Sequence, residues 1–252
     1  MTDTALITGA TAGIGAEFAR QLARRGWNLV LVARNAERLE HIADDLQQRF
    51  QINVEVITAD LTQQEQLKTV ENRLRDRARP IELLVNNAGF GLKKPFEQND
   101  LEEEQSHLDI LLRVPMRLTH AVLPGMLERG KGRIISVASV AGFIPSGTYG
   151  ASKAWVISFS RWANIFYRAR GVKITALCPG FVRTEFHDRM RVSTEQIPEW
   201  MWLSPEQVVW EGLRDNYRGR AVSVPSARYK IAVALTRVLP ARVAVQRTRK
   251  DS

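Results

Sequence analysis

The sequence of 252 residues is poor in the features that mark secreted, metal-binding and membrane-spanning proteins. Because Cys178 is the single cysteine, the chain cannot form an internal disulfide, and we expect a cytoplasmic protein. Cys178 lies at the end of an expected core strand, and we interpret it as a small buried hydrophobe. The four histidines show no ligand spacing with cysteine or carboxylates, so we expect no metal site. No apolar run approaches the roughly 20 residues that span a bilayer. The first apolar strand begins near Ala5, which leaves no room for a signal peptide.

Acidic residues are scarce near the C-terminus. The net charge is +9, and residues 218–252 carry +8 of it, because nine lysines and arginines there are opposed by Asp251 alone. The rest of the chain is nearly neutral, which argues against a nucleic-acid partner and favours a basic tail at 226–252. Within this tail, apolar side chains recur at helical spacing, at Ile231, Leu235, Val238 and Leu239. Such a partly amphipathic stretch fits either peripheral contact with an anionic membrane or a helix docked on the body. The basic residues of the tail fit either contact with phosphates or a solvated terminus.

Short segments rich in β-branched residues alternate along the chain with longer segments of helical character. The expected strands are 5–8, 28–33, 54–59, 83–86, 133–137, 173–178 and 221–224. The expected helices are 14–25, 36–50, 63–77, 101–128 and 149–170, followed by one from the N-cap Ser204 to Tyr217. This order predicts an α/β fold, a single Rossmann-like, doubly wound parallel sheet of about seven strands flanked by helices, in one domain over residues 1–225.

A glycine-rich loop, Thr8–Gly15, joins the first expected strand to the first expected helix. Its glycines allow a tight turn and a close approach to a pyrophosphate, whose charge is stabilised by the free amides and the dipole at the helix start. Glycine also ends strands for structural reasons, but the position directly after the opening strand favours a dinucleotide site. The cofactor residues that we assign to this loop are Gly9, Thr11, Gly13, Ile14 and Gly15.

The tip of the second expected strand carries no carboxylate. An acidic residue there would accept hydrogen bonds from both ribose hydroxyls of NAD, whereas Arg34 can pair with a 2′-phosphate through its planar fork. We therefore expect NADP as the cofactor. The alternative is that Arg34 is an ordinary surface arginine.

Two further motifs complete the pattern. Residues Asn86–Gly89 lie at the end of the fourth expected strand, where the carboxyl ends of parallel strands form a ligand crevice. Taken alone, these residues would also fit a simple turn.

Tyr149 and Lys153 are four residues apart and therefore share one helix face. Taken alone, a tyrosine and a lysine at this spacing would also fit an ordinary surface pair. A lysine ammonium beside the phenol, with the positive nicotinamide ring close by, is expected to lower the tyrosine pKa from about 10 and to fit it for general acid–base catalysis.

Taken together and in this order, the motifs over residues 4–225 resemble the short-chain dehydrogenase/reductase family. The resemblance implies that Ser139 binds the reacting oxygen, that Tyr149 exchanges its proton, and that Lys153 holds the nicotinamide ribose and lowers the tyrosine pKa. It also implies a homodimer or homotetramer joined through the helices at 101–129 and 149–170. The cofactor residues that it adds to the glycine loop and Arg34 are Asp60, Leu61, Asn87, Ala88, Gly89, Tyr149, Lys153, Pro179, Gly180, Val182 and Thr184.

The sequence departs from this family at two places. Leu111 occupies the position where the family usually carries an asparagine that anchors water in the proton relay to the lysine, and a leucine side chain cannot hydrogen-bond. The stretch from Ser139 to Tyr149 is also a few residues shorter than usual. Ser136 lies at a more ordinary distance from Tyr149, but the run from Ser139 to Gly142 matches the family better, so we assign the catalytic role to Ser139.

The expected function is the NADPH-dependent reduction of a carbonyl to a secondary alcohol. Large apolar residues between Thr184 and Ser204, the region that this family uses as a substrate lid, favour an apolar or lipid-like substrate. They are Phe186, Met190, Ile197, Trp200, Met201 and Trp202, and they also fit loop packing or a subunit interface. Lid and tail resemble a bacterial subgroup of ketoacyl and mycolate-type reductases. The alternatives are a secondary-alcohol dehydrogenase with the same residues and an NADP-binding sensor or interaction protein with little turnover, which Leu111 alone supports.

Overall fold

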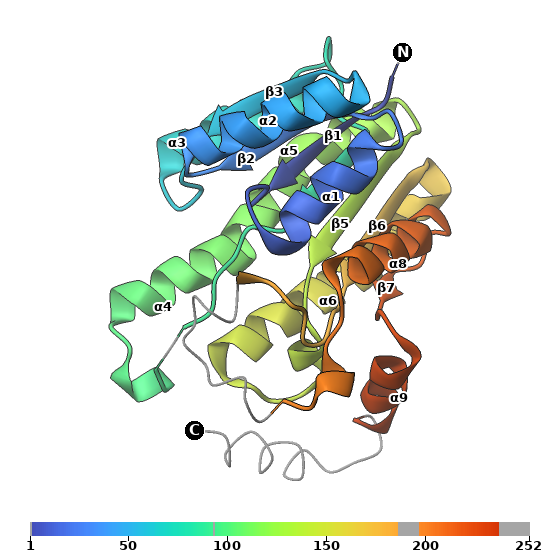
Figure 1. The fold of residues 1–252 in the computed structure, drawn as a ribbon. Helices are drawn as coiled ribbons and strands as arrows, with labels where there is room; N and C mark the ends of the chain where they lie inside the picture. Colours follow the sequence, from blue (N-terminus) through green and yellow to red (C-terminus); the bar gives the residue numbers. More distant parts are fainter. Residues whose placement is uncertain (1, 93, 186–196, 237–252) are drawn as a thin grey trace.

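The computed structural model describes residues 2–92, 94–185 and 197–236 of the chain (Figure 1). Within them, seven parallel strands form one sheet in the order β3-β2-β1-β4-β5-β6-β7. The strands are β1 (Thr4–Thr8), β2 (Asn28–Ala33), β3 (Val54–Thr58), β4 (Leu83–Asn86), β5 (Gly132–Val137), β6 (Val172–Leu177) and β7 (Val222–Ser223). The expected doubly wound parallel sheet is confirmed, and each expected strand agrees with the structure to within one residue at either end. The order reverses between β1 and β4, which is the point where open α/β sheets bind ligands.

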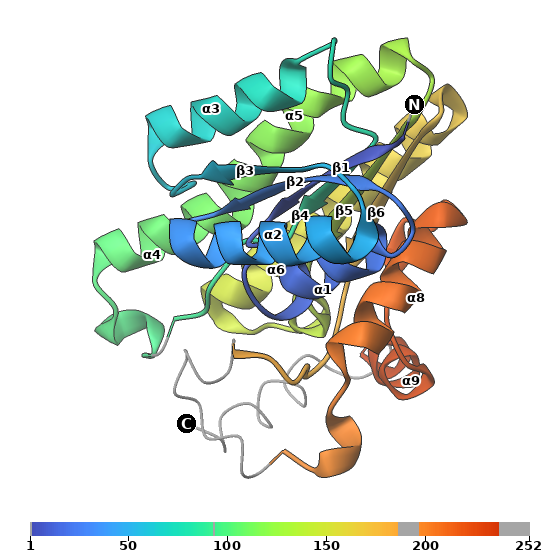
Figure 2. The same ribbon diagram turned by 45° about the horizontal axis from the view of Figure 1, so that its top comes forward.

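Helices cover both faces of the sheet (Figure 2). On one face lie α1 (Gly13–Ala23), α2 (Ala36–Phe50) and α8 (Pro205–Tyr217), and on the other lie α3 (Gln64–Arg75) and α5 (Val114–Glu128). The long helix α6 (Gly147–Tyr167) packs against β6. The central strands are buried on both sides, which explains their continuous apolar sequences.

The N-terminus of α8 forms as its sequence predicts. The Ser204 side chain accepts a hydrogen bond of 3.2 Å from the Gln207 N–H, and Pro205 takes the first helical position, where its missing N–H costs nothing. This cap fixes the point at which the segment after β6 rejoins the body.

The expected helix at 101–128 is helical throughout. Its middle, Asp109–Arg113, is a π-helical turn that contains Leu111 and joins α4 (Leu101–Leu108) directly to α5. Pro115 provides the reason, because it has no N–H to bond the Leu111 carbonyl four residues earlier. The helix therefore widens at the position where the family usually carries its asparagine.

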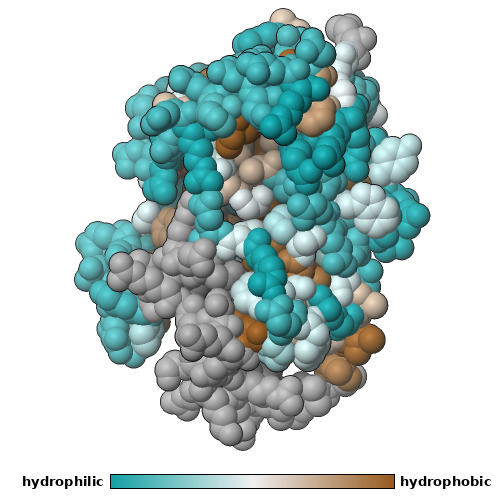
Figure 3. Space-filling model, in the orientation of Figure 1, coloured by the Kyte–Doolittle hydropathy of each residue, from teal (hydrophilic) through white to brown (hydrophobic). Residues whose placement is uncertain are grey.

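A C-terminal helix, α9 (Ala227–Leu235), docks on the body. Tyr229 and Val233 are buried in the core cluster on the α1 and α8 side, and Lys230 lies 3.5 Å from Glu211. Its outer side is hydrophobic: Ile231 is exposed, and Figure 3 shows apolar surface at the lower right, where Figure 1 draws α9. The sequence left two alternatives for this stretch, contact with a membrane and docking on the body. Its described part docks on the body, while Val238 and Leu239 lie outside the described residues.

Every helix that the structure describes is too short or too polar to span a lipid bilayer.

Candidate active site

The glycine loop lies between the end of β1 and the start of α1. Gly9 and Gly13 have positive φ angles of 66° and 51°, and a Cβ atom on Gly15 would come within 2.2 Å of the Gly9 carbonyl oxygen. Only glycine fits such positions without strain. α1 begins without a side-chain cap and without an acidic residue in its first turn, so its N–H groups and the positive end of its dipole face the loop. This geometry suits a pyrophosphate.

Asn87 braces this loop from the end of β4. Its Nδ2 donates to the carbonyl oxygens of Thr8 at 2.9 Å and Gly9 at 3.1 Å. The backbone N–H groups of Asn87 and Ala88 both donate to Thr8 Oγ1 at 3.0 Å. The Asn87 amide and the Thr8 hydroxyl therefore tie the ends of β1 and β4 together, at the point where the strand order of the sheet reverses.

The segment after β6 lies on the other side of the glycine loop. The Pro179 carbonyl accepts a hydrogen bond of 3.0 Å from the Val140 N–H, and Val182 forms an isolated bridge with Leu203. A Cβ atom on Gly13 would meet the Thr184 side chain at 3.0 Å, so the loop and this segment are in close contact. The structure thus brings together two groups of predicted cofactor residues that are far apart in sequence.

Tyr229 supports the same segment and was missed by the sequence analysis. Its ring lies over Gly180, where a Cβ atom would come within 1.9 Å of the ring. Its hydroxyl accepts from the Phe181 N–H at 3.1 Å and donates to the Met201 carbonyl at 2.9 Å. No local pattern points to this residue, because its partners come from elements far earlier in the chain.

Arg34 lies exposed directly after β2, at the same edge of the sheet as the glycine loop. The neighbouring Arg38 is engaged elsewhere, because it forms an ion pair of 2.5 Å with Glu185. The hydrogen bond to Glu185 raises the pKa of Arg38. Of these two arginines, Arg34 is exposed after β2 and Arg38 is held by Glu185.

The remaining predicted cofactor residues lie at the same edge. Asp60 follows β3 and accepts hydrogen bonds from the Thr62 N–H at 3.0 Å and the Thr62 hydroxyl at 2.7 Å, while Leu61 is buried. Thr11 and Ile14 are partly buried in the glycine loop. Asp60 therefore shapes the turn after β3 in addition to any contact with the cofactor.

Ser139, Tyr149 and Lys153 meet beyond the end of β5. The Ser139 side chain accepts a hydrogen bond of 3.1 Å from the Ala141 N–H and is also hydrogen-bonded to Tyr149. Lys153 lies one turn further along α6, with its Nζ 5.4 Å from the centre of the Tyr149 ring. The same Nζ donates to the Val137 carbonyl at 2.8 Å. These contacts bring the three residues into one cluster.

Ser136 has a different environment. It is buried within β5, and its Oγ accepts a hydrogen bond of 3.2 Å from Asn86 Nδ2, which also reaches Thr119 at 3.3 Å. This network joins β4, β5 and α5. The geometry favours Ser139 over Ser136 as the serine that acts with the tyrosine.

The expected lowering of the Tyr149 pKa is wrong for the protein alone. Burial raises the pKa of Tyr149 to about 12, and the hydrogen bond from Ser139 offsets only part of this effect. Burial also lowers the pKa of Lys153 to about 8, and its ammonium is directed to the Val137 carbonyl. Desolvation of the phenolate therefore outweighs the hydrogen bond from Ser139, and the phenol is protonated at neutral pH.

Leu111 fills the position of the usual asparagine with apolar atoms. It is buried in the core cluster against which Tyr149 packs, and a Cβ atom on Gly89 would come within 2.8 Å of Leu111 Cδ2. The leucine side chain cannot anchor water here.

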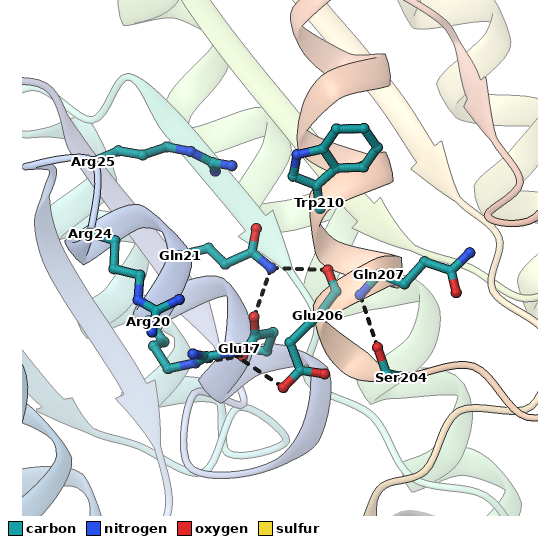
Figure 4. Close-up of a pocket in the computed structure, with 9 residues that line it drawn as sticks. All are labelled: Glu17, Arg20, Gln21, Arg24, Arg25, Ser204, Glu206, Gln207 and Trp210. Carbon is teal, nitrogen blue, oxygen red and sulfur yellow. Dashed lines mark hydrogen bonds and ion pairs between the residues drawn. The ribbon is translucent and has the colours of Figure 1, made fainter.

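A separate hollow of about 590 Å³ lies between α1 and α8 (Figure 4). None of the predicted cofactor or catalytic residues lines it. Gln21 Nε2 donates to Glu17 of the same helix at 2.7 Å and to the Glu206 carbonyl of α8 at 3.0 Å, and Arg20 forms an ion pair of 3.2 Å with Glu206. The contacts to Glu206 tie the two helices together, so the hollow is part of a helix–helix contact. In the described part of the chain, no group of three histidine, cysteine or acidic side chains is placed to hold a metal ion.

Comparison with known proteins identifies the family. The family model for short chain dehydrogenases matches residues 3–195, so the chain belongs to the short chain dehydrogenase family of oxidoreductases, and the resemblance drawn from the motifs is confirmed. It is 38% identical over 191 residues to sulfoacetaldehyde reductase 2 of Chromohalobacter salexigens, a match that covers 74% of this chain and 75% of that one.

Solved structures of the family share the whole fold. A short-chain dehydrogenase from Sphingobium yanoikuyae in complex with NADPH matches with a TM-score of 0.87 at 34% identity, over 99% of this chain and 96% of that one. A bulky-bulky ketone specific alcohol dehydrogenase from Comamonas testosteroni matches with a TM-score of 0.81 at 35% identity, over 93% and 92% of the two chains.

Proposed function

We propose that the protein is an NADPH-dependent reductase that converts a carbonyl into a secondary alcohol. The observation that carries this proposal is the cluster of Ser139, Tyr149 and Lys153, at the sheet edge that also holds the glycine loop. The relatives support it, since one is a reductase by name, one is complexed with NADPH and one is named for ketones.

The residues at this edge fit NADPH. The glycine loop leaves no room for a Cβ atom at Gly15 and opens toward the uncapped start of α1, which suits the pyrophosphate. Arg34 would pair with the 2′-phosphate, and the segment from Pro179 to Thr184 would hold the nicotinamide end. When bound, NADPH supplies the hydride.

Three side chains perform the proton chemistry in this proposal. Ser139 donates a hydrogen bond to the carbonyl oxygen and so stabilises the negative charge that develops there. Tyr149 gives its hydroxyl proton to that oxygen, and its pKa of about 12 keeps the proton in place at neutral pH until then. Lys153 holds the ribose and stabilises the phenolate left behind. Reduction uses the protonated phenol as it stands, whereas the rival alcohol oxidation begins from the phenolate.

The substrate in this proposal is apolar or lipid-like, and residues 184–204 form its lid within a catalytic domain of residues 1–225. Trp202 packs against Phe181 with ring centroids 5.9 Å apart, next to the segment assigned to the nicotinamide, and Trp200 is exposed. Phe186 and Met190 of the same lid lie outside the described residues. Aromatic side chains at this place favour a bulky apolar group beside the carbonyl.

A panel of ketones tests the function. NADPH consumption is followed with aryl ketones such as butyrophenone and with small polar ketones, and NADH serves as the control cofactor. Turnover with NADPH and a preference for the bulky ketones support the proposal. Fluorescence that shows NADPH binding without turnover of any ketone would instead favour the sensor, and faster turnover with NADP⁺ and secondary alcohols would favour the dehydrogenase.

The proposed partner is a second copy of the chain, joined through the helices at 101–129 (α4 and α5) and 149–170 (α6). Apolar side chains on α6 face outward: Ile165 is 80% exposed, and Trp162 and Phe166 stack with ring centroids 5.7 Å apart. An isolated monomer rarely exposes so much clustered apolar surface. Sedimentation of Ile165→Glu tests this, with Ile231→Glu on α9 as the control: a wild-type oligomer that persists in Ile165→Glu would contradict it.

Peripheral membrane contact through the basic tail is a separate proposal. It rests on the positive charge of residues 237–252, which lie outside the described part of the chain. Liposomes with anionic lipid are sedimented with the full chain and with a chain that ends at residue 236, which keeps α9 intact. Equal binding of the two forms would remove this proposal.

A further inference from the structure

His107 is a buried polar residue beside Tyr149 that the mechanism above leaves unused. It lies on α4, one turn before Leu111, and its exposed fraction is 0%. Its ring stacks on Tyr149 with centroids 6.1 Å apart and planes 26° apart. Phe90, just after the Asn86–Gly89 motif, packs on it at 5.6 Å. The imidazole therefore lies in the wall of the candidate active site.

The nitrogens of His107 are poorly satisfied. Neither has a hydrogen bond of normal geometry within the described residues. The Phe90 backbone lies close enough to favour the protonated ring, but one backbone group serves at most one of the two nitrogens. A buried polar group left unpaired costs about 1–3 kcal/mol, whereas a phenylalanine would fill this space without that cost. The imidazole therefore lowers the stability of the folded protein relative to a phenylalanine. A buried polar group that lowers stability is typical of a residue with a role in the reaction.

Glu104 extends the polar path toward the start of α4. It lies one turn before His107 and is almost fully buried. Its Oε1 accepts a hydrogen bond of 2.9 Å from Asn99, and its Oε2 has no partner among the residues described. A carboxylate and an imidazole three residues apart lie on the same helix face, so they lead from the helix start to Tyr149.

The charges around His107 keep its ring neutral. Burial lowers its pKa, the carboxylate of Glu104 on the same helix raises it, and the ammonium of Lys153 from α6 lowers it again, with a net lowering from the usual value. The other titratable group that faces it from α6 is Tyr149. A neutral imidazole has one N–H and one free nitrogen, so it can accept a proton on one side and donate one on the other.

We propose that His107, supplied by Glu104, relays the proton that restores Tyr149, in place of the asparagine that the family usually carries at the position of Leu111. This inference rests on the proposed function. During reduction, the Oη–H bond of Tyr149 breaks and the O–H bond of the alcohol forms, which leaves a phenolate. The Glu104 carboxylate first takes up a proton from solvent. His107 then gives its N–H proton to the phenolate through one water as its other nitrogen takes that proton from Glu104, so one proton enters for each one that leaves with the alcohol.

The test replaces the imidazole by a ring that cannot relay. His107→Phe keeps the packing on Tyr149, and its kcat with NADPH and butyrophenone is expected to fall about tenfold or more, with the KM for NADPH unchanged. The solvent deuterium isotope effect on kcat is expected to rise, because proton transfer becomes limiting, and the urea midpoint is expected to stay or rise. Leu111→Asn in the His107→Phe background restores the usual anchor and is expected to recover kcat. His120→Phe, an exposed histidine on α5, is the matched control.

The outcomes separate this inference from the proposed function. Wild-type protein that turns over no ketone refutes the reductase itself. An active wild type with His107→Phe at full kcat overturns only the relay, and so does a loss of kcat without a change in isotope effect and without recovery by Leu111→Asn. If His107→Phe does not fold, His107→Gln decides: a full kcat overturns the relay, and a loss with a raised isotope effect supports it.

Discussion

Replacing Lys153 with methionine is expected to stabilise the folded protein while it removes the activity. The side chain is 7% exposed, and burial lowers its pKa from 10.5 to about 8. One pKa unit corresponds to about 1.4 kcal/mol, so holding the ammonium in this site costs about 3 kcal/mol at neutral pH. Methionine has a similar length but loses the hydrogen bond to the Val137 carbonyl, which cancels about 1–2 kcal/mol of the gain. A net increase of about 1–2 kcal/mol in the free energy of unfolding follows.

Urea unfolding over a range of pH measures this effect. The folded-state pKa lies below the unfolded value, so the unfolded chain binds more protons between pH about 8 and 10.5, and wild-type stability rises with pH in that window. The advantage of Lys153→Met is therefore largest at neutral pH and shrinks as the pH rises through this window. Lys68→Met, at an exposed position on α3, is the control without such a change. A Lys153→Met protein less stable than wild type at neutral pH, or an advantage independent of pH, would refute the reasoning.

Three further predictions concern the reaction. Ser139→Ala is expected to lower kcat about 100-fold with little change in stability. Ser136→Ala instead removes the acceptor of a buried hydrogen bond and is expected to cost about 1 kcal/mol of unfolding free energy. Steady-state kinetics and urea unfolding of both variants check this, and full turnover in Ser139→Ala would contradict the assignment. Arg34→Glu is expected to raise the KM for NADPH about tenfold or more and to leave that for NADH unchanged. Arg49→Glu, in the last turn of α2, is the control, and an unchanged NADPH KM in Arg34→Glu would exclude the phosphate contact. The kcat/KM for reduction is expected to decline above pH about 8, where Lys153 loses its proton. A pH–rate profile measures it, and a rise through that region would show that the ammonium is not required.

Local patterns predicted the sheet, the glycine loop and the Ser204 cap, because each depends on residues adjacent in sequence. β-branched runs become strands wherever helices cover both faces, and the Ser204–Pro205 pair is a sufficient start for α8. The π-helical turn within the helix at 101–128 had a local cause as well, since Pro115 lacks the backbone donor that would bond the Leu111 carbonyl four residues earlier.

Properties that depend on distant partners could not be predicted. The brace from Tyr229 to Phe181 and Met201 joins elements whose approach only the fold determines. The direction of the Tyr149 pKa depends on how much water the fold excludes from the phenol, and the spacing to Lys153 carries no information on that. The burial of His107 could not be predicted for the same reason, because a histidine on a short helix rich in glutamate gives no sign that it is buried.

The reduction of butyrophenone by Tyr149→Phe tests the central claim most directly. Wild-type protein and the control Tyr167→Phe, at the far end of α6, are predicted to consume NADPH and to form the secondary alcohol. Tyr149→Phe is predicted to bind NADPH as wild type does, by nicotinamide fluorescence, and to lose about 100-fold or more of kcat. Turnover by Tyr149→Phe at the wild-type rate would contradict the assignment of the proton to Tyr149.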